Sequence, residues 1–528
     1  MGTRGYTVYR HKGRYYVYYN HFDSYPDGLG LQVLHEIPRN VSKEEFEEWV
    51  EHTIRHPLQL GNSDGSSKSN FVPDKRPEND DYYIEWFYEI DLDNLVFHVN
   101  NQPLFRLDNM PPDDIFLESI SYDHFGHRAL YEHTPAQYRY DWRAPPPSPL
   151  PESLAAYNSC HIRSSTSSVH DLLDVPVALS SIERVRTTLV EVLVAKCMVE
   201  GGVGHDVRVL ENVPDRDHIP QSMLQLALSF VNFAVGPPIP SLPRTPYDNT
   251  CDFIWIREDV CLRITTHLDD EDNLRASIGD LVHHINTTLG KVGTIYGVAC
   301  SIFHCAIVRV DKDDLGTSVA HTPAFQFLPS FYARTMFTPG IEALSRLGSQ
   351  ASGVEFLNAI SDASNRPHFT HLTHEGLLTT DSVVAKVPVE VWTRIGGFIT
   401  SPADLVTLAS VSPQAMSAAV DLTRYPWVKE FRLVDVISSG PVEPIPETTK
   451  NTDAEDFRCY FYKLGRAIFT AVRGGRRIKV ELGQEYGVEY ADRRDKSFKV
   501  QTYLSGPVVI TNNRLYILEE LNDDNTTS

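Results

Sequence analysis

Three prolines at short intervals constrain the region Val387–Val420 more than any other feature constrains the rest of the chain. Pro388, Pro402 and Pro413 each suit the first turn of a helix, where the missing N–H leaves no hydrogen bond unmade. The spacing therefore predicts three short helices. Helices of this length cannot each bury an apolar face alone, so they must pack on one another and still leave apolar surface for a partner.

The residues around these prolines support the prediction. Ser401 and Ser412 directly precede two of them, as N-cap residues do. Apolar residues also recur at helical spacing in each segment. The faces that this spacing defines are Val387, Val391, Ile395 and Phe398 in the first helix, Leu405, Leu408 and Ala409 in the second, and Met416, Ala419 and Val420 in the third.

About 40 of the 528 residues, roughly 386–425, resemble an F-box. The resemblance rests on an apolar-Pro-x-Glu-apolar element at Val387–Val391, the helix face that contains Ile395, Phe398 and Ile399, a Pro-x-Asp-Leu element at Pro402–Leu405, and the Leu408–Ser412 stretch. It implies a small helical bundle that binds the Skp-type adaptor of a cullin-RING ubiquitin ligase through apolar contacts. The adaptor-binding residues that it implies are Val387, Pro388, Glu390, Val391, Ile395, Phe398, Pro402, Leu405 and Leu408.

The segment departs from the family pattern at two places. Gly396 and Gly397 lie inside the first predicted helix, where each glycine costs about 1 kcal/mol relative to alanine. Pro413–Met416 replaces the basic and aromatic end of the third F-box helix.

The chain as a whole is expected to be a multi-domain α+β protein. Composition shifts and proline-rich or polar stretches suggest its boundaries. They divide it into an α+β unit of two hairpins and a helix at 1–143, a proline-rich linker at 144–151, a mixed α/β region at 152–380, the F-box-like segment at 386–430, a linker at 437–454, a β-rich C-terminal segment at 455–521 and a disordered tail at 522–528.

Local patterns predict the main elements of these segments. Alternating aromatic and β-branched residues indicate strands, and Ser-x-x-Glu sequences indicate helix starts. The predicted hairpins are 6–10 with 15–20, 82–90 with 95–107, and 252–256 with 260–265. The predicted helices are 43–54, one that begins after Ser180 and ends at Gly201-Gly202, 221–235 and 274–289. The other predicted strands are 297–310, 477–482, 498–504 and 508–518.

The net charge and the number and spacing of the cysteines argue against several classes of protein. The formal net charge of −22 is poorly suited to nucleic acid or anionic membrane, and no stretch approaches the ~20 apolar residues of a membrane span. The seven cysteines include no CxxC pair, and the chain opens without an apolar signal core, so we expect reduced thiols and a cytoplasmic or nuclear location. Residues 456–499 stand apart, because 11 basic and 6 acidic residues give a local charge of 11 − 6 = +5.

Few side chains look catalytic. His21, Asp23 and Asp27 collect at the end of the first hairpin and could perform acid–base chemistry if buried, although a simple turn also explains them. The His368, His371 and His374 cluster lacks the spacing of a metal motif, and Cys300, His304 and Cys305 lie in an apolar run that is typical of a buried strand. No cofactor motif occurs.

Two readings remain. The first is an F-box-like interaction protein without a catalytic site, which recruits an unknown protein target to a ubiquitin ligase. The second is an enzyme with its site in the N-terminal α+β unit, near His21, in which the helical segment is structural. The first predicts that the apolar face of the short helices is exposed, and the second predicts a deep pocket with perturbed carboxylates.

Overall fold

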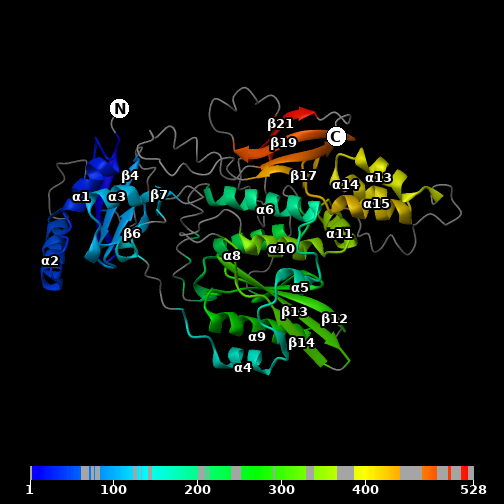
Figure 1. Cartoon of the computed structure of the whole chain (residues 1–528), viewed down its shortest axis with the longest axis horizontal. Coiled ribbons are helices and arrows are strands. Elements are labelled where there is room, and N and C mark those ends of the chain that lie inside the picture. Colours follow the sequence, from blue (N-terminus) through cyan, green and yellow to red (C-terminus); the bar gives the residue numbers. More distant parts are fainter. Residues whose placement is uncertain are drawn as a thin grey trace. The chain divides into compact units, whose positions relative to one another are not determined.

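The protein is described from a computed structural model (Figure 1). The described residues are 3–60, 70–72, 77, 84–122, 128–131, 134–140, 146–199, 207, 210, 213, 215–239, 251–288, 292–314, 316–328, 338–364, 386–439, 467–484, 497–500 and 513–520. They divide into two compact units, one built from residues 1–143 and the other from most of the chain beyond residue 143. The chain is a multi-domain α+β protein, as the sequence predicts.

The first unit is a six-stranded mixed sheet with helices. The strands lie in the order β3-β2-β1-β4-β5-β6, in which β1 pairs with β2 antiparallel and with β4 parallel. The strands are β1 Gly5–His11, β2 Arg14–Asn20, β3 Asn70–Phe71, β4 Trp86–Asp91, β5 Val96–Val99 and β6 Gln102–Arg106, with a separate pair β7 Ile120–Tyr122 and β8 Arg128–Leu130. The helices are the π-helix η1 Pro26–Gly30, α1 Leu31–His35, α2 Lys43–Leu60 and α3 Asp113–Ser119, with 3-10 turns η3 Leu107–Asn109 and η4 Ala136–Tyr138.

The first predicted hairpin is confirmed, and the second is only partly right. Lys12 and Gly13 form the β1–β2 turn with positive φ angles of 51° and 69°. The stretch predicted as one strand from Leu95 to Leu107 is two strands, because Asn100 and Asn101 turn the chain at φ angles of 50° and 65°. Asparagine tolerates this left-handed conformation better than most residues.

Side-chain alternation along β4 gives the sheet two different faces. Trp86, Tyr88 and Ile90 join the larger core, to which α1, α2 and α3 contribute. Phe87 faces the other way and packs with Tyr6 and residues of β1 and β2. The period of two residues in a strand places Glu89 and Asp91 on this second face.

The second unit stacks helices and two sheets in layers (Figure 1). Helices α4 and α9 cover one face of a seven-stranded sheet, and α8 and α10 contact its other side. Six of its strands follow the order β10-β11-β12-β13-β14-β9, and β15 pairs with β13. Helix α6 lies between α8 and α10 and a six-stranded sheet of order β16-β17-β18-β19-β21-β20. The helices are α4 Pro151–Ser159, α5 Val169–Leu173, α6 Ser181–Val199, η6 Arg216–His218, α8 Gln221–Val235, α9 Glu271–Thr288, α10 Pro339–Ser349, α11 Gly353–Ala363, α13 Val389–Gly397, α14 Pro402–Ala409 and α15 Pro413–Thr423.

The two sheets of this unit contain most of its predicted strands. The strands are β9 Ile162–Ser164, β10 Phe253–Arg257, β11 Val260–Ile264, β12 Gly293–Cys300, β13 His304–Asp313, β14 Gly316–His321, β15 Phe325–Gln326, β16 Trp427–Val428, β17 Phe431–Ser439, β18 Ala467–Arg473, β19 Arg476–Gln484, β20 Ser497–Val500 and β21 Asn513–Glu520. The predicted strand 297–310 is wrong, because a turn at Ser301 divides it into the antiparallel pair β12 and β13. Six strands of this unit were not predicted from the sequence: β9, β14, β15, β16, β17 and β18.

Shared cores join regions that the sequence analysis had separated. Val185, Leu189, Val192 and Leu193 of α6 form one core with the C-terminal sheet, which includes Phe431 of β17. The middle, helical and C-terminal regions therefore belong to one compact unit rather than to three. Residues 437–439, placed in a linker by the sequence analysis, belong to β17. The rest of that linker and the tail 522–528 lie outside the described residues.

The capping boxes predicted at two helix starts are present. Ser42 accepts a hydrogen bond from the Glu45 N–H at 3.3 Å, and the Ser42 N–H donates to the Glu45 carboxylate at 2.9 Å. Ser180 and Glu183 repeat the arrangement at 3.2 and 2.8 Å. These bonds satisfy donors that a helix start leaves open. In the part of the chain that the structure describes, no helix is both long and apolar enough to cross a lipid bilayer.

Candidate functional site

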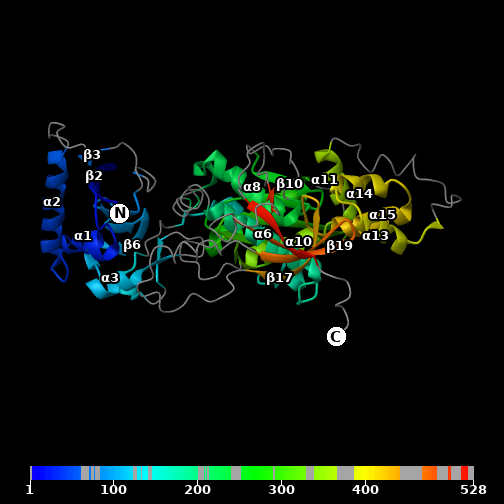
Figure 2. The same cartoon turned by 90° about the horizontal axis from the view of Figure 1, so that it is seen from above.

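The three proline-started helices are present as predicted. Helices α13, α14 and α15 lie together in Figure 2. Pro402 and Pro413 occupy first positions of α14 and α15, whereas Pro388 is the N-cap of α13. Ser412 caps α15 by accepting a hydrogen bond from the Ala415 N–H at 3.1 Å, whereas the Ser401 side chain makes no capping bond.

One side of α13 is packed tightly against the neighbouring helices. Trp392 and Gly396 are buried there. A Cβ at residue 396 would overlap Cδ1 of Leu422 and lie 3.3 Å from Cδ2 of Leu408. Glycine at this position therefore lets α13 approach α15, so the departure from the F-box pattern at residue 396 has a packing reason.

Two residues assigned to the adaptor-binding face lie in the core instead. Leu405 is 0% exposed and Leu408 is 8% exposed, and both pack in the core of the three helices. Helical spacing places the two leucines on one face of α14, but it does not show whether that face points toward the core or toward solvent. Neither side chain is available to a partner.

The rest of the predicted face is accessible. Val391, Ile395 and Phe398 are 45%, 43% and 60% exposed, and their spacing places them along one side of α13. We call these three residues the α13 strip. Among the other assigned residues, Pro388 and Glu390 are exposed, and Val387 and Pro402 are half-buried.

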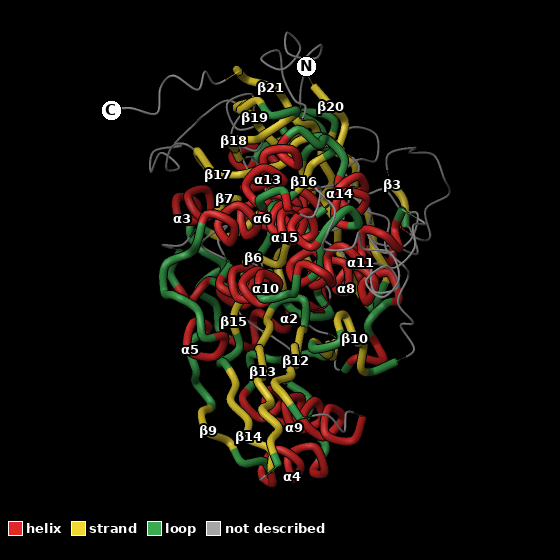
Figure 3. The backbone as a smooth tube through the Cα atoms, turned by 90° about the vertical axis from the view of Figure 1, so that its right-hand side faces the viewer, coloured by secondary structure: helices red, strands yellow, loops and turns green. Residues whose placement is uncertain are grey.

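The end of the α13 strip meets the turn between β18 and β19. The Gly475 N–H donates a hydrogen bond to the Gly397 carbonyl at 3.1 Å. A Cβ at residue 475 would lie 2.5 Å from Cε1 of Phe398, and Gly475 has a φ of 80°, so both space and backbone conformation favour glycine there. Figure 3 shows α13 beside the C-terminal sheet.

Arginines surround this turn. Arg473 forms an ion pair with Glu430 at 2.8 Å, and Arg476 and Arg477 are exposed. We call residues 473–477 the basic hairpin. It belongs to the locally basic stretch that the sequence analysis identified.

The polar cluster proposed at the end of the first hairpin is not a buried site. His21, Asp23 and Asp27 are all exposed, and His21 shares a hydrogen bond of 2.8 Å with the Tyr19 hydroxyl. The Asp23 carbonyl accepts from the Leu29 N–H at 3.0 Å, which holds the chain turn. The arrangement does not desolvate the carboxylates, as an acid–base site requires, so it does not support catalysis.

A buried polar cluster that was not predicted from the sequence lies on the second face of the first sheet. Ligand-type atoms of Glu89, Asp91 and His98 all lie within 4.8 Å of one another. The signal was Glu89 and Asp91 two residues apart on one strand, but nothing in the sequence pairs them with His98.

Contacts around Asp91 give this cluster a structural role. Its carboxylate accepts from Arg10 at 2.6 Å, from the Asn94 side chain at 2.8 Å and from the Asp93 N–H at 2.9 Å. Burial raises the pKa of Asp91, but the His98 imidazole, whose Nε2 lies 3.7 Å from Oδ2, the hydrogen bond from Asn94 and the charge of Arg10 outweigh it and hold the pKa well below its usual range. Two carboxylates and an imidazole suit a divalent metal, yet Asp91 already pairs with the Arg10 guanidinium, which neutralises its charge.

The thiols of the apolar run are buried, as expected. Cys300 and Cys305 are fully buried across the β12–β13 pair. Burial raises the pKa of Cys300 to about 12 and that of Cys305 well above its usual value, which removes the thiolate needed for catalysis. The cluster of His368, His371 and His374 lies outside the described residues.

No model of a protein family, no curated protein and no solved structure matches the chain. A functional proposal therefore depends on the residues described above.

Proposed function

We propose that this protein is an F-box-like interaction protein that docks a Skp-type adaptor of a cullin-RING ubiquitin ligase through the α13 strip. One observation carries the proposal: Val391, Ile395 and Phe398 remain exposed although the opposite side of the same helix is buried. A helix of nine residues with apolar side chains on both sides is stable only if its neighbours cover one of them. The other side is then free for a partner.

The three helices have different roles in this proposal. Helices α14 and α15 supply the buried support through Leu405, Leu408 and Leu422, and α13 presents the strip. Three apolar side chains along one helix suit the helix-in-groove mode of recognition. Glu390 is exposed in the first turn of α13, where a carboxylate stabilises the helix through its dipole.

The rest of the chain would hold the protein target. The first unit has its own core and sheet, so it folds as a separate recognition module in this proposal. Recruitment of this kind needs no catalytic residue and no cofactor. It places the protein in the cytoplasm or nucleus, where ubiquitin ligases act.

The test is calorimetric titration of the full chain with a purified Skp-type adaptor. Ile395→Asp puts a charge in the middle of the strip and should weaken binding at least about thirtyfold, as loss of an interface hot spot does. Thr393→Asp introduces the same charge on the same helix, at an exposed position outside the strip, and should change affinity less than threefold.

Two results would contradict the proposal. One is the absence of binding by a wild-type chain with a cooperative melting transition. The other is equal loss of affinity in both variants. This would mean that a new charge anywhere on α13 weakens binding, and not only a charge within the strip. Val391→Asp provides a second strip position should Ile395→Asp lower the melting temperature.

A further inference from the structure

We infer that the adaptor groove receiving the α13 strip is bordered by carboxylates, and that the basic hairpin contacts them. The docking surface then has two parts, an apolar one from the helical segment and a positively charged one from the C-terminal sheet. This inference rests on the proposed function, because it names the chemistry of the partner that occupies the same site.

The apolar α13 strip and the basic hairpin are continuous with each other. Phe398 ends the strip and touches the hairpin at Gly475, where the backbone bond from Gly475 to Gly397 joins helix and sheet. The hairpin is two strands paired in register from Ala467 with Leu482 to Arg473 with Arg476. It is therefore a firm projection beside α13 and not a loose loop.

The two exposed arginines of the hairpin lie close to the end of the strip. Consecutive Cα atoms are about 3.8 Å apart, so Arg476 and Arg477 begin one and two residues from the contact that Gly475 makes with Phe398. Their positions lie within about one Debye length, ~8–10 Å, of that contact. A partner seated on the strip therefore lies within the range of these charges, and more so at low ionic strength.

The basic hairpin differs in charge from the chain as a whole. The chain carries −22 and repels an acidic partner at long range. Within residues 473–477 the balance is reversed, since this stretch contains three arginines and no acidic residue, and Arg476 and Arg477 are exposed. Charges at the rim of an interface raise the association rate and select partners by complementarity. An adaptor with carboxylates at this border satisfies both parts of the surface.

The experiment measures association rates of the full chain with a Skp-type adaptor in 50 mM and 500 mM NaCl. Arg476→Glu/Arg477→Glu should lower the association rate constant about tenfold in low salt, and the difference should shrink in high salt. The matched control is Arg163→Glu/Arg275→Glu, which makes the same change in net charge on β9 and α9, at the opposite end of the unit in Figure 3. The control should stay within about twofold of wild type.

Each outcome decides a different claim. Equal rates for the hairpin variant and the control, with Ile395→Asp still weakening binding at least about thirtyfold, overturn the inference and leave the proposed function standing. Failure of the wild-type chain to bind overturns both. If the hairpin variant melts below wild type, Arg476→Gln/Arg477→Gln replaces it, and about a threefold loss in low salt is then expected.

Discussion

Gly396 packs so closely against Leu422 that a Cβ at residue 396 would overlap the Cδ1 methyl of this leucine. The neighbouring Gly397 has open space where its Cβ would lie. Adjacent glycines in one helix thus have different roles. Gly396 is required by packing, whereas Gly397 is not.

Alanine substitutions should separate these roles. Gly396→Ala should lower the free energy of unfolding by about 1–3 kcal/mol, because Leu422 must move. Gly397→Ala is the matched control and should leave stability unchanged or raise it by up to about 1 kcal/mol, since alanine favours helix. Urea denaturation of both variants provides the measurement. Equal effects would mean that α13 does not pack on α15 as described.

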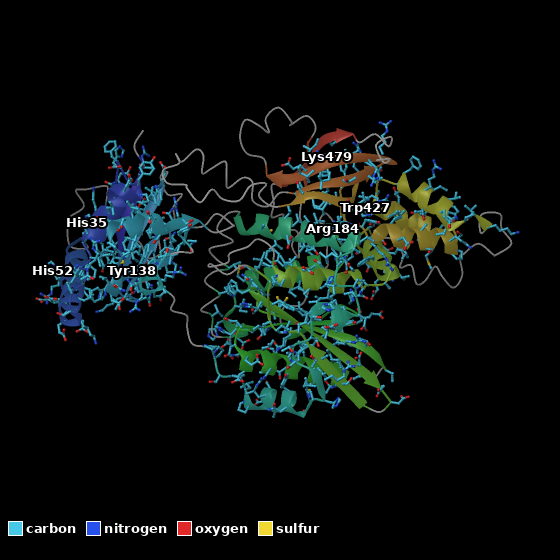
Figure 4. The ribbon with its side chains drawn as sticks, viewed as in Figure 1. His35, His52, Tyr138, Arg184, Trp427 and Lys479 are labelled. Atoms are coloured by element: carbon cyan, nitrogen blue, oxygen red, sulfur yellow. The ribbon has the colours of Figure 1, made fainter. Side chains whose placement is uncertain are left out.

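Arg186 should be among the most costly residues of α6 to replace. It is fully buried and donates from Nε to the Ala234 carbonyl at 3.0 Å, and from Nη2 to Ala234 at 2.8 Å and to Gly236, at the end of α8. Arg186→Met leaves these carbonyls without donors and should cost about 3 kcal/mol. Arg184→Met, at the exposed position labelled in Figure 4, should change stability by less than about 0.5 kcal/mol. Chemical denaturation would contradict the assignment if the two losses were alike.

Glu191 makes stability depend on pH. Burial raises the pKa of Glu191 to about 8, and the charge of Glu342 adds to this, while a hydrogen bond from the Thr338 backbone opposes it. Between the unfolded pKa of about 4.3 and the folded value, the folded state holds the proton that the unfolded state has lost. Stability from this group therefore falls as pH rises through that window.

Glu191→Gln should remove this dependence. At pH 5 the variant and wild type should unfold at similar denaturant concentrations. At pH 8.5 the variant should be more stable, by an amount on the order of 1–2 kcal/mol. Glu258→Gln, at an exposed position, is the control and should follow the wild-type curve. Parallel curves for all three proteins would show that the Glu191 carboxyl is not desolvated.

Arg432 is a buried cation with an aromatic environment. Its guanidinium lies 5.8 Å from the ring centre of Trp427, which Figure 4 labels, and 5.9 Å from that of Tyr425. Its Nε and Nη1 make no hydrogen bond to the described residues, and burial lowers its pKa.

Removing this charge should cost little or nothing. Arg432→Met should leave the free energy of unfolding unchanged or raise it by up to about 2 kcal/mol, because a buried charge with two unbonded nitrogens is expensive. Arg473→Met removes a half-buried arginine with an ion-pair partner and should cost up to about 1 kcal/mol. Thermal melts of the two variants should therefore shift in opposite directions. A fall of more than about 2 kcal/mol for Arg432→Met would indicate an anionic partner.

Local signals in the sequence predicted local structure well. The Ser180–Glu183 capping box marks the start of α6, and the apolar run at Gln221–Val235 coincides with α8. Short-range hydrogen bonds and side-chain period decide these elements, so they can be read without knowledge of the fold. The turn at Ser301 was missed because the residues on both sides of it are equally apolar.

The features that sequence patterns did not predict depend on contacts between distant parts of the chain. The period of α14 identified Leu405 and Leu408 but not the direction in which they point, since α13 and α15 cover them. Glu89 and His98 meet only through the pairing of β4 with β5. The joining of α6 with the C-terminal sheet brings together residues more than 200 positions apart, and no local pattern reports such contacts.

The measurement that tests the central claim most directly is hydrogen–deuterium exchange of the full chain with and without a Skp-type adaptor. We expect slower exchange in α13, residues 389–397, and in the basic hairpin when the adaptor is added, with α9 unchanged as an internal reference. Unchanged exchange in α13, or protection confined to another element, would contradict the claim that the α13 strip is the docking surface.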